Sequence, residues 1–297
     1  MGFSTEGRQV NSSPLLLLCY FSGCSVLNGN GGAVLHTSST DFEARSCVFK
    51  DCHARSGEGG GIYSTGLKHS VIACCFDGCS SSSYGQGLHI SGSSGNFMEK
   101  TLICNSPQPY AGSRASWSLY NYHSTINNHN DTNMLSNSRE AGGHYRQGPE
   151  YITKYIVMNN CAGPTIYGVY NSNGKLGETI HGLMINNTVT KSGLLAPWGG
   201  NHHITDMYFV KNTGSLTTSD VFYGMHDPHY TFEDCYSDAP MDGYHVTTCN
   251  CIDSFRELEA PHMSVPSVCL PHSCVFTYAK STRSLLMTLL FVLLTVN

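Results

Sequence analysis

A short cysteine motif occurs three times in the first third of the chain at nearly constant spacing. Residues 19–24, 47–52 and 74–79 each read C-x-F-x-x-C, and the successive steps are 28 and 27 residues. A glycine cluster that enters a short apolar run follows each motif by a few residues. Two linked motifs at one period indicate a repeat architecture, in which each unit buries its apolar face against its neighbours.

The pattern continues in a weaker form as an apolar residue followed three positions later by Asn or Cys. These later members are Leu102 with Asn105, Met158 with Cys161, Met184 with Asn187, Phe209 with Asn212, and Phe232 with Cys235, together with Thr125 and Asn128 as the poorest match. The mean step over the whole series is about 26 residues, a period typical of solenoids.

The contents of each unit distinguish between the solenoid types with this period. Leucine-rich repeats require several Leu residues at fixed offsets and an outer helix, a pattern that these units lack. They contain short apolar or alternating runs instead, such as residues 33–35, 71–73 and 165–170, separated by Gly, Ser and Asn. Such runs are typical of strands bounded by turns. The sequence therefore predicts an all-β parallel β-helix of about nine coils over residues 15–240.

Equivalent residues of a parallel β-helix lie above one another at the interstrand distance of about 4.8 Å. We therefore expect one interior apolar column, and burial of each member stabilises the fold by roughly 1.5 to 3 kcal/mol. The expected members are Phe21, Phe49, Phe76, Leu102, Met158, Met184, Phe209 and Phe232.

The residue three positions after each column member is expected at a corner of the coil. Asn tolerates left-handed backbone there, stacked amides hydrogen-bond to their neighbours, and Cys is a small buried substitute. These corner residues are Cys24, Cys52, Cys79, Asn187, Asn212 and Cys235.

Residues 15–24 have a second interpretation, as the apolar core and cleavage region of a secretory signal. We favour the repeat, because residues 15–24 align with 43–52 and 70–79 without a gap and a seven-residue apolar run is short for a signal core. With no other leader ahead of the repeat, we expect either an incomplete amino-terminus or an unusual export route.

The paired signatures resemble those of a known family. Gly-Gly-Ala-Val at residues 31–34 and the Phe-x-x-Asn/Cys motifs are similar to the GGA-I and F-x-x-N repeats of polymorphic membrane proteins. The C-x-F-x-x-C spelling and the Ser/Asn-rich coils look more like the β-helix surface proteins of trichomonad protists. The resemblance covers about residues 15–240. It implies a right-handed parallel β-helix, in agreement with the crossover rule, displayed at a cell surface for adhesion. It implies no catalytic residues.

The sequence predicts four parts of the chain. Residues 1–14 are expected to form an amino-terminal arm and 15–240 the β-helix, within which 107–146 looks irregular, with loops or a broken coil. A cysteine-containing cap or stalk over 241–283 and an apolar membrane-tether segment over 284–297 complete the order.

The apolar tail has three interpretations. Residues 285–296 would span only about 18 Å as a helix, against a hydrocarbon core of roughly 30 Å. The alternatives are a truncated membrane helix, an attachment signal removed during lipid anchoring, and an apolar tail packed on the solenoid. We predict a short apolar helix that associates with a membrane.

Composition limits the functional classes. Only 12% of the 297 residues are charged and the net charge is −5, with no basic stripe, so we expect no nucleic-acid partner. The 14 cysteines and the sequons at Asn11, Asn130 and Asn186 are compatible with a secretory route and with glycosylation.

The cysteines allow three interpretations. The C-x4-C spacing is poor for zinc, which usually takes two closer pairs. Stacked cysteines lie within disulfide range, so Cys24 with Cys52, or Cys47 with Cys74, are candidate bridges. We expect free buried thiols instead, because in-register side chains point the same way. In the cap, Cys249 with Cys251 and Cys269 with Cys274 are the stronger disulfide candidates.

Histidines and aspartates near the end of the repeat suggest a metal site, which we do not predict. They are His202, His203, Asp206, His226, Asp227, His229, Asp234 and His245. No carboxylates are expected to stack, because Asp206, Asp227 and Asp234 align in different columns. We therefore predict a non-catalytic surface protein without cofactor or metal that binds a protein or glycan. The alternative is a polysaccharide lyase or glycoside hydrolase of the β-helix type.

Overall fold

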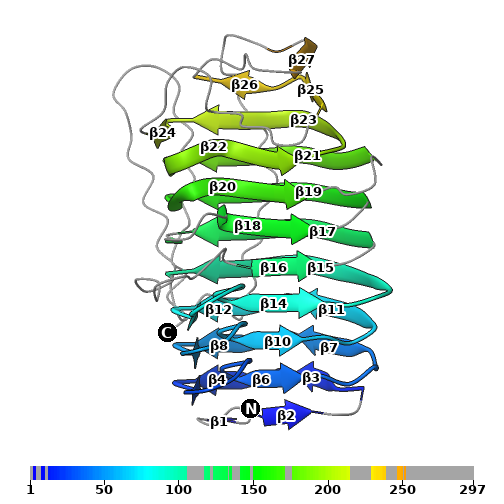
Figure 1. The fold of residues 1–297 in the computed structure, drawn as a ribbon, viewed down its shortest axis with the longest axis vertical. Helices are drawn as coiled ribbons and strands as arrows, with labels where there is room; N and C mark the ends of the chain where they lie inside the picture. The colour runs from blue at the N-terminus through cyan, green and yellow to red at the C-terminus, as the bar shows by residue number, and fades with distance from the viewer. Residues whose placement is uncertain are drawn as a thin grey trace, which may run out of the picture.

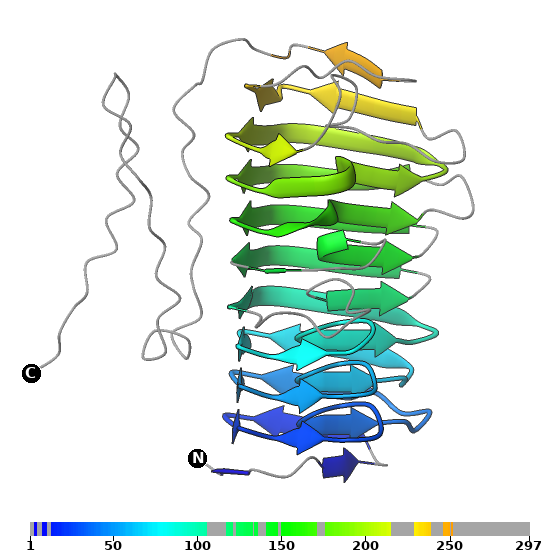
Figure 2. The same cartoon turned by 60° about the vertical axis from the view of Figure 1, so that its left-hand side comes forward.

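The computed structural model shows an all-β chain wound into a parallel β-solenoid, with strands stacked along one long axis (Figures 1 and 2). The described residues are 3–4, 8–10, 13–105, 117–120, 123–132, 134–135, 141–147, 150–170, 176–214, 229–238, 246–249 and 251. Every strand pair within these ranges is parallel. These findings confirm the predicted class of fold.

The strands of the described residues form three sheets that run along the solenoid. The 15-stranded sheet contains β1 (Phe3–Ser4), β3 (Leu15–Leu17), β4 (Tyr20–Ser22), β7 (Phe42–Arg45), β8 (Val48–Lys50), β11 (Lys68–Ile72), β12 (Cys75–Asp77), β15 (Gly95–Cys104), β17 (His123–Thr132), β19 (Glu150–Asn159), β21 (Leu176–Ile185), β23 (Asn201–Val210), β25 (His229–Glu233), β26 (Tyr236–Ser237) and β27 (Val246–Cys249).

Of the two other sheets, one runs along the solenoid and the other is confined to the coils near the amino-terminus. The nine-stranded sheet contains β2 (Arg8–Val10), β6 (Val34–His36), β10 (Ile62–Ser64), β14 (Leu88–Ser91), β16 (Trp117–Tyr120), β18 (Ala141–Gln147), β20 (Ala162–Tyr170), β22 (Thr188–Trp198) and β24 (Thr213–Gly214). The three-stranded sheet contains β5 (Ser25–Val26), β9 (His53–Ala54) and β13 (Ser80–Ser81).

Two columns of residues in left-handed backbone turn the chain between strands. The first corner contains Leu18, Ser46, Ala73, Lys100, Tyr155, His181, Asp206 and Asp234, with φ between 50° and 64°. The second contains Gly23, Asp51, Gly78, Asn105, Asn160, Asn186 and Lys211. Gly and Asn adopt this conformation readily. The members of the first corner are all other residue types, most of which adopt it only with backbone strain.

The predicted aromatic stack is present at the amino-terminal end. Phe21 pairs with Phe49 and Phe49 with Phe76 in adjacent strands, and the ring centroids are 5.0 and 4.7 Å apart with nearly parallel planes. All three side chains are buried. Burial of stacked rings at the interstrand spacing makes this column a principal part of the core.

The column beyond Phe76 differs from the prediction at Leu102 and at Phe232. Ile103, not Leu102, pairs with Phe76, and Leu102 pairs with Cys75 on the outer side of the same strands. The column then continues through Asp131, Met158, Met184 and Phe209. The alignment was one residue out of register at Leu102, and a one-residue slip moves a strand side chain to the opposite face.

Phe232 belongs to a second interior column. It pairs with Ile204 in the strand before it, so it lies one corner earlier in its coil than Phe209 does. The sequence prediction therefore placed Phe232 in the wrong column. The members of this second column are Leu16, Ala44, Val71, Met98, Ile126, Thr153, Thr179, Ile204 and Phe232.

Asp131 is an exception within the first column. Its side chain and that of His129 are both fully buried, and His129 Nε2 lies 3.1 Å from Asp131 Oδ1. Buried polar side chains are tolerated where a partner compensates, and Ile103 and Met158 flank Asp131 in its column. No sequence motif predicted it.

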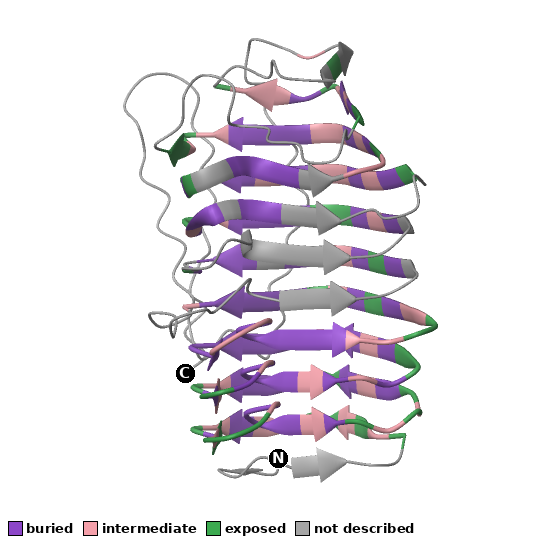
Figure 3. Ribbon diagram, in the orientation of Figure 1, coloured by how far each residue is buried: buried purple, intermediate pink, exposed green. Residues whose placement is uncertain are grey.

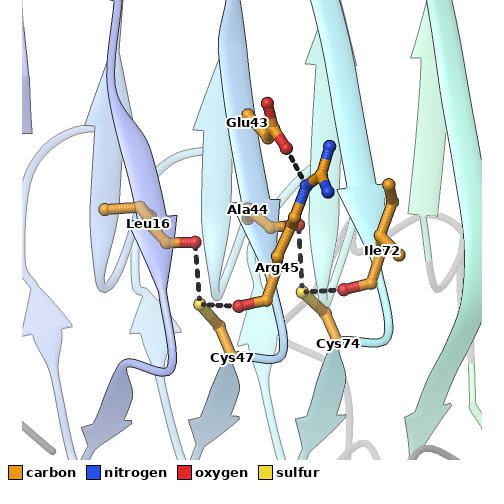
Figure 4. A network of polar contacts seen from close by, with 7 residues as sticks. All are labelled: Leu16, Glu43, Ala44, Arg45, Cys47, Ile72 and Cys74. Carbon is orange, nitrogen blue, oxygen red and sulfur yellow. Dashed lines mark hydrogen bonds and ion pairs between the residues drawn. The ribbon is translucent and has the colours of Figure 1, made fainter.

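The cysteines form two ladders of buried thiols. In the first, Cys47 donates to the carbonyls of Leu16 and Arg45, and Cys74 donates to those of Ala44 and Ile72 (Figure 4). Thr101 takes the same place in the next coil with its hydroxyl. These cysteines are free, as expected. Cys235 has the same contacts, with Ile204 and Glu233, so it belongs to this ladder and not with Cys24, Cys52 and Cys79.

The second ladder follows the second corner. Cys24, Cys52 and Cys79 are buried, and Cys161 takes the same position near the other end of the solenoid. Asn187 and Asn212 replace Cys in the last coils, where Asn212 Oδ1 accepts hydrogen bonds from the Asn187 backbone and side-chain amides. The predicted amide stacking is therefore confirmed, but the left-handed residue is the one before each member of this ladder.

The strand ladder continues through the segment expected to be irregular. Strand β17 pairs in register with β15 and β19, and β18 pairs with β20 with a register shift between Ala141 and His144. The described parts of residues 107–146 therefore keep the ladder and contain one irregularity, as expected in part. Short pairings also extend the ladder at both ends, from β1 to β4 and from β25 to β27.

Residues 252–297 lie outside the described residues, and the expected apolar helix and membrane tether fall on them. Within the described residues, no helix is long and apolar enough to cross a membrane.

Candidate functional site

The outward side of β7, β11, β15 and β17 presents one column of side chains to solvent. Glu43, Ser70, Phe97 and Thr125 are in register from coil to coil. Strand side chains alternate between faces, so the residues that precede them point inward and are buried. Figure 3 shows this alternation as bands along β7 and β11.

A groove of about 420 Å³ lies along this column. Its lining residues are Asp41, Phe42, Glu43, Lys68, His69, Ser70, Gly95, Asn96, Phe97 and Thr125. Asp41 and Lys68 are exposed, and the Phe97 side chain is 36% exposed. An open groove that combines an exposed aromatic ring with both acidic and basic groups has the character of a ligand site.

Behind the groove, buried polar side chains form a hydrogen-bonded network. Ser64 Oγ lies 2.7 Å from His36 Nδ1 and 2.8 Å from His69 Nε2. The Gly66 backbone amide also donates to His69 Nε2, so this nitrogen is an acceptor and the ring is neutral. Burial lowers the pKa of His69 to about 4. Ser64 is fully buried, so the arrangement is structural and does not present a nucleophile to the groove.

Asn96 differs from its neighbours in this network. Its side chain is only 6% exposed, yet neither Oδ1 nor Nδ2 has a hydrogen-bond partner. Asn96 lies close enough to His69 to oppose the fall in the pKa of that ring, but the two side chains do not meet hydrogen-bond geometry. Buried amides are normally satisfied, so this one calls for an explanation.

A smaller groove of about 240 Å³ lies over β21, β23 and β25. The buried ring of His202 in its wall has both nitrogens satisfied, with Nδ1 2.8 Å from the Tyr151 hydroxyl and Nε2 2.7 Å from the Gly199 carbonyl. Burial lowers the pKa of His202 to about 4. Since its buried polar groups are already paired, this groove is a weaker candidate than the larger one.

The sequence prediction that no carboxylates stack is wrong at the first corner. Thr205 pairs with Glu233, which places Asp206 and Asp234 at the same corner of consecutive coils. Asp206 forms an ion pair with His181, and Glu233 Oε2 lies 3.0 Å from His203 Nε2. The alignment missed this stack because it placed Asp206 and Asp234 in different columns.

The other candidate residues are only partly covered by the structure. His226, Asp227 and His245 lie outside the described residues, while His203 and His229 line the smaller groove. The described ranges contain no group of three or more His, Cys, Asp or Glu side chains able to hold a metal ion.

The three sequons lie in different environments. Asn186 is exposed at a corner, and Thr188 of the same sequon is also exposed. Asn130 lies in β17, where its backbone is in register with Leu102 and Val157. Asn11 lies outside the described residues. Asn186 therefore has the accessibility that glycosylation requires.

One described cysteine is oxidised. Cys104 is disulfide-bonded. Cys251 is a free thiol in contact with the Phe232 carbonyl, which rules out the expected pairing of Cys249 with Cys251.

No family model, curated protein or solved structure matches this chain.

Proposed function

We propose that this protein is a surface-displayed, right-handed parallel β-helix of about nine coils that mediates adhesion without catalysis. The observation that carries the proposal is the 420 Å³ groove on the outward side of β7, β11 and β15. A solenoid holds such side chains on a rigid ladder, which suits recognition of an extended protein or glycan ligand. The resemblance to polymorphic membrane proteins supports the same role at the level of the fold.

Two features support passage through an oxidising compartment. The disulfide at Cys104 is typical of secreted and surface proteins, and Asn186 is an accessible glycosylation sequon. The apolar residues 285–296 supply the membrane association in this proposal.

Localisation of a tagged chain tests the proposal. The full chain is expected at the surface of intact cells, where an impermeant biotin reagent labels it, and removal of residues 284–297 is expected to release it into the medium. An Asn186→Gln variant of the full chain should lose mass on a gel only if that site is glycosylated. A full-length product found wholly in the cytosol contradicts the surface role.

The stacked carboxylates of Asp206 and Asp234 favour a second candidate function. Equivalent corner positions lie roughly 4.8 Å apart along the solenoid, near the carboxylate spacing of retaining glycosidases. His181, paired with Asp206, adds a group suited to proton transfer. This candidate is a polysaccharide lyase or glycoside hydrolase.

Assay of purified protein against polygalacturonate and neutral polysaccharides distinguishes the two functions. Activity that Asp206→Asn and Asp234→Asn each reduce by a factor of 100 or more, while Glu43→Gln leaves it unchanged, would establish the enzyme. We expect no activity from any of these proteins.

A further inference from the structure

We infer that the stacked thiols of Cys19, Cys47 and Cys74 bind a soft monovalent cation, of which Cu(I) is the biological example, with each ion held in line between two successive sulfurs. We call these three residues the thiol row. Thiolate sulfur is the ligand type that selects Cu(I) over harder cations. The inference does not depend on the proposed surface role, and it departs from the sequence-based expectation that the protein binds no metal.

The backbone places the members of the thiol row directly above one another. Tyr20 pairs with Val48 and Val48 with Cys75, so the residues that precede these three are in register as well. The Val48 amide donates to the Cys19 carbonyl, and the Cys75 amide donates to the Cys47 carbonyl, both at 2.9 Å. Successive members of the row are therefore separated by one interstrand spacing of about 4.8 Å.

The side chains of the row have the same orientation in successive coils. The Cys47 thiol contacts the carbonyls of Arg45 and Leu16, at 3.2 and 3.4 Å (Figure 4). The Cys74 thiol makes the equivalent contacts one coil further on, at 3.3 and 3.5 Å. Cys19 likewise donates to the carbonyl two residues before it, and the Cys47 thiol interacts with the thiols on both sides. The sulfurs therefore repeat at about the interstrand spacing.

This spacing suits a bridging ion better than a disulfide. A disulfide requires its two sulfurs to be bonded at about 2.05 Å, and side chains that point the same way from strands about 4.8 Å apart do not meet at that distance. Two metal–sulfur bonds of about 2.3 Å, the length found in zinc sites, span roughly 4.6 Å when they lie in line. A two-coordinate ion therefore fits between successive sulfurs. Such an ion does not require the three-ligand group that the described ranges lack.

The two ends of the row set how many ions it holds. Thr101 takes the place of the next cysteine, and its hydroxyl makes the same carbonyl contacts. A hydroxyl oxygen is a hard ligand that Cu(I) disfavours, so the row ends at Cys74. At the other end Cys19 is only partly buried, which gives an ion a way in, whereas Cys47 and Cys74 are fully buried. Three sulfurs in line leave two places for an ion.

Binding exchanges thiol protons for metal ions. Three thiols release three protons and take up two Cu(I) ions, so the filled row carries one net negative charge, and no electron is transferred. Because the ligand is the thiolate, the affinity is expected to rise with pH. The ladder of Cys24, Cys52 and Cys79 is stacked in the same way, but all three of its thiols are buried, so none of them gives an ion a way in.

Anaerobic titration of the purified full chain with Cu(I), in competition with a chromophoric Cu(I) chelator, tests the inference. Other thiols of the chain can also bind copper, so the test compares variants with the unmodified chain. Cys47→Thr is expected to lower the number of tightly bound ions by two, because it removes the sulfur that both ions share. Cys74→Thr is expected to lower it by one. Thr is the substitute because the fold already accepts Thr101 at the equivalent place, and circular dichroism checks that each variant is folded.

Cys75→Val is the matched control. Cys75 is as deeply buried as the thiol row, but its register neighbours are Val48 and Leu102, so it does not belong to a stack of sulfurs. Val already occupies the equivalent place in the preceding coil. This variant is expected to bind as many Cu(I) ions as the unmodified chain.

A second measurement tests the site without any substitution. X-ray absorption of the unmodified chain loaded with two Cu(I) ions is expected to show two sulfur neighbours for each copper. Excess Zn(II) is expected to leave these ions in place, because zinc prefers four ligands in a tetrahedron. The inference is overturned if Cys47→Thr binds as many ions as the unmodified chain, if Cys75→Val loses as many as Cys47→Thr, or if the copper has three or more neighbours.

Discussion

At the scale of single residues, buried histidines make the stability of the solenoid depend on pH. Burial lowers the pKa of His69, His89 and His202 to about 4, against 6.5 for an unfolded histidine. Between these values the unfolded chain binds protons that the folded chain does not, so stability rises with pH across this window.

The free energy of unfolding is therefore expected to fall as the pH drops from about 6.5 towards 4, by roughly 1 to 3 kcal/mol for each of these histidines. Urea unfolding followed by circular dichroism at several pH values measures it. His202→Gln should reduce the pH dependence of the unfolding free energy by the contribution of one histidine. An unfolding free energy that does not change over this window is the contrary result.

Residue patterns in the sequence predicted the apolar side chains of the interior better than the polar ones. The stacked Phe21 and Phe49 follow directly from a repeated motif, because identical side chains at one period must stack. The buried pair of His129 and Asp131, and the unpartnered Asn96, occur once each and have no periodic signal. The groove was not predicted for the same reason, since Phe97 is an isolated aromatic residue in the sequence.

A second prediction at this scale concerns backbone strain. Lys100 is exposed and has a φ of 50° at the first corner, a conformation that Asn adopts more readily than Lys. Lys100→Asn is expected to stabilise the protein by about 0.5 to 1 kcal/mol in thermal or urea unfolding. Lys154→Asn is the control, because Lys154 is also exposed but lies in the strand just before that corner; it should bring no stabilisation. An equal gain at both positions would show that corner strain is not the cause.

At the scale of elements, the strands were found where apolar runs alternate with Gly, Ser and Asn, but their registers were harder to assign. The sequence aligned Phe232 with Phe209 because both precede Asn or Cys by three residues. Each coil contains two corners, however, and Cys can follow either of them, as Cys74 and Cys79 do within one coil. The motif therefore does not distinguish the corners, which also concealed the stacking of Asp206 on Asp234.

Packing between strands predicts a large effect at Phe49, which is fully buried between Phe21 and Phe76. Phe49→Ala is expected to destabilise the protein by about 3 to 5 kcal/mol, through lost burial and the cavity left behind. Phe97→Ala, on an exposed ring of the same type, should cost less than about 1 kcal/mol. Urea unfolding measures both, and equal losses would contradict the assignment of Phe49 to the core.

At the scale of the whole molecule, each coil of the solenoid adds one interstrand spacing along its long axis. Neighbouring strands of the 15-stranded sheet are parallel from β1 to β27, and its outward face presents the groove and the carboxylate corner on different coils. The period of about 26 residues was enough to predict this architecture. Residues 252–297 and the function itself have no such internal repetition, so the sequence pattern constrains them less.

The distance between Glu43 and Glu178 tests the architecture most directly. These outward residues are joined through Ser70, Phe97, Thr125 and Ile152 by five steps of register. Spin labels on unnatural amino acids at both positions, measured by pulsed electron paramagnetic resonance, should give a narrow distribution centred near 24 Å, five steps of roughly 4.8 Å. A broad distribution, or one centred beyond about 40 Å, would show that residues one period apart are not neighbours in adjacent coils.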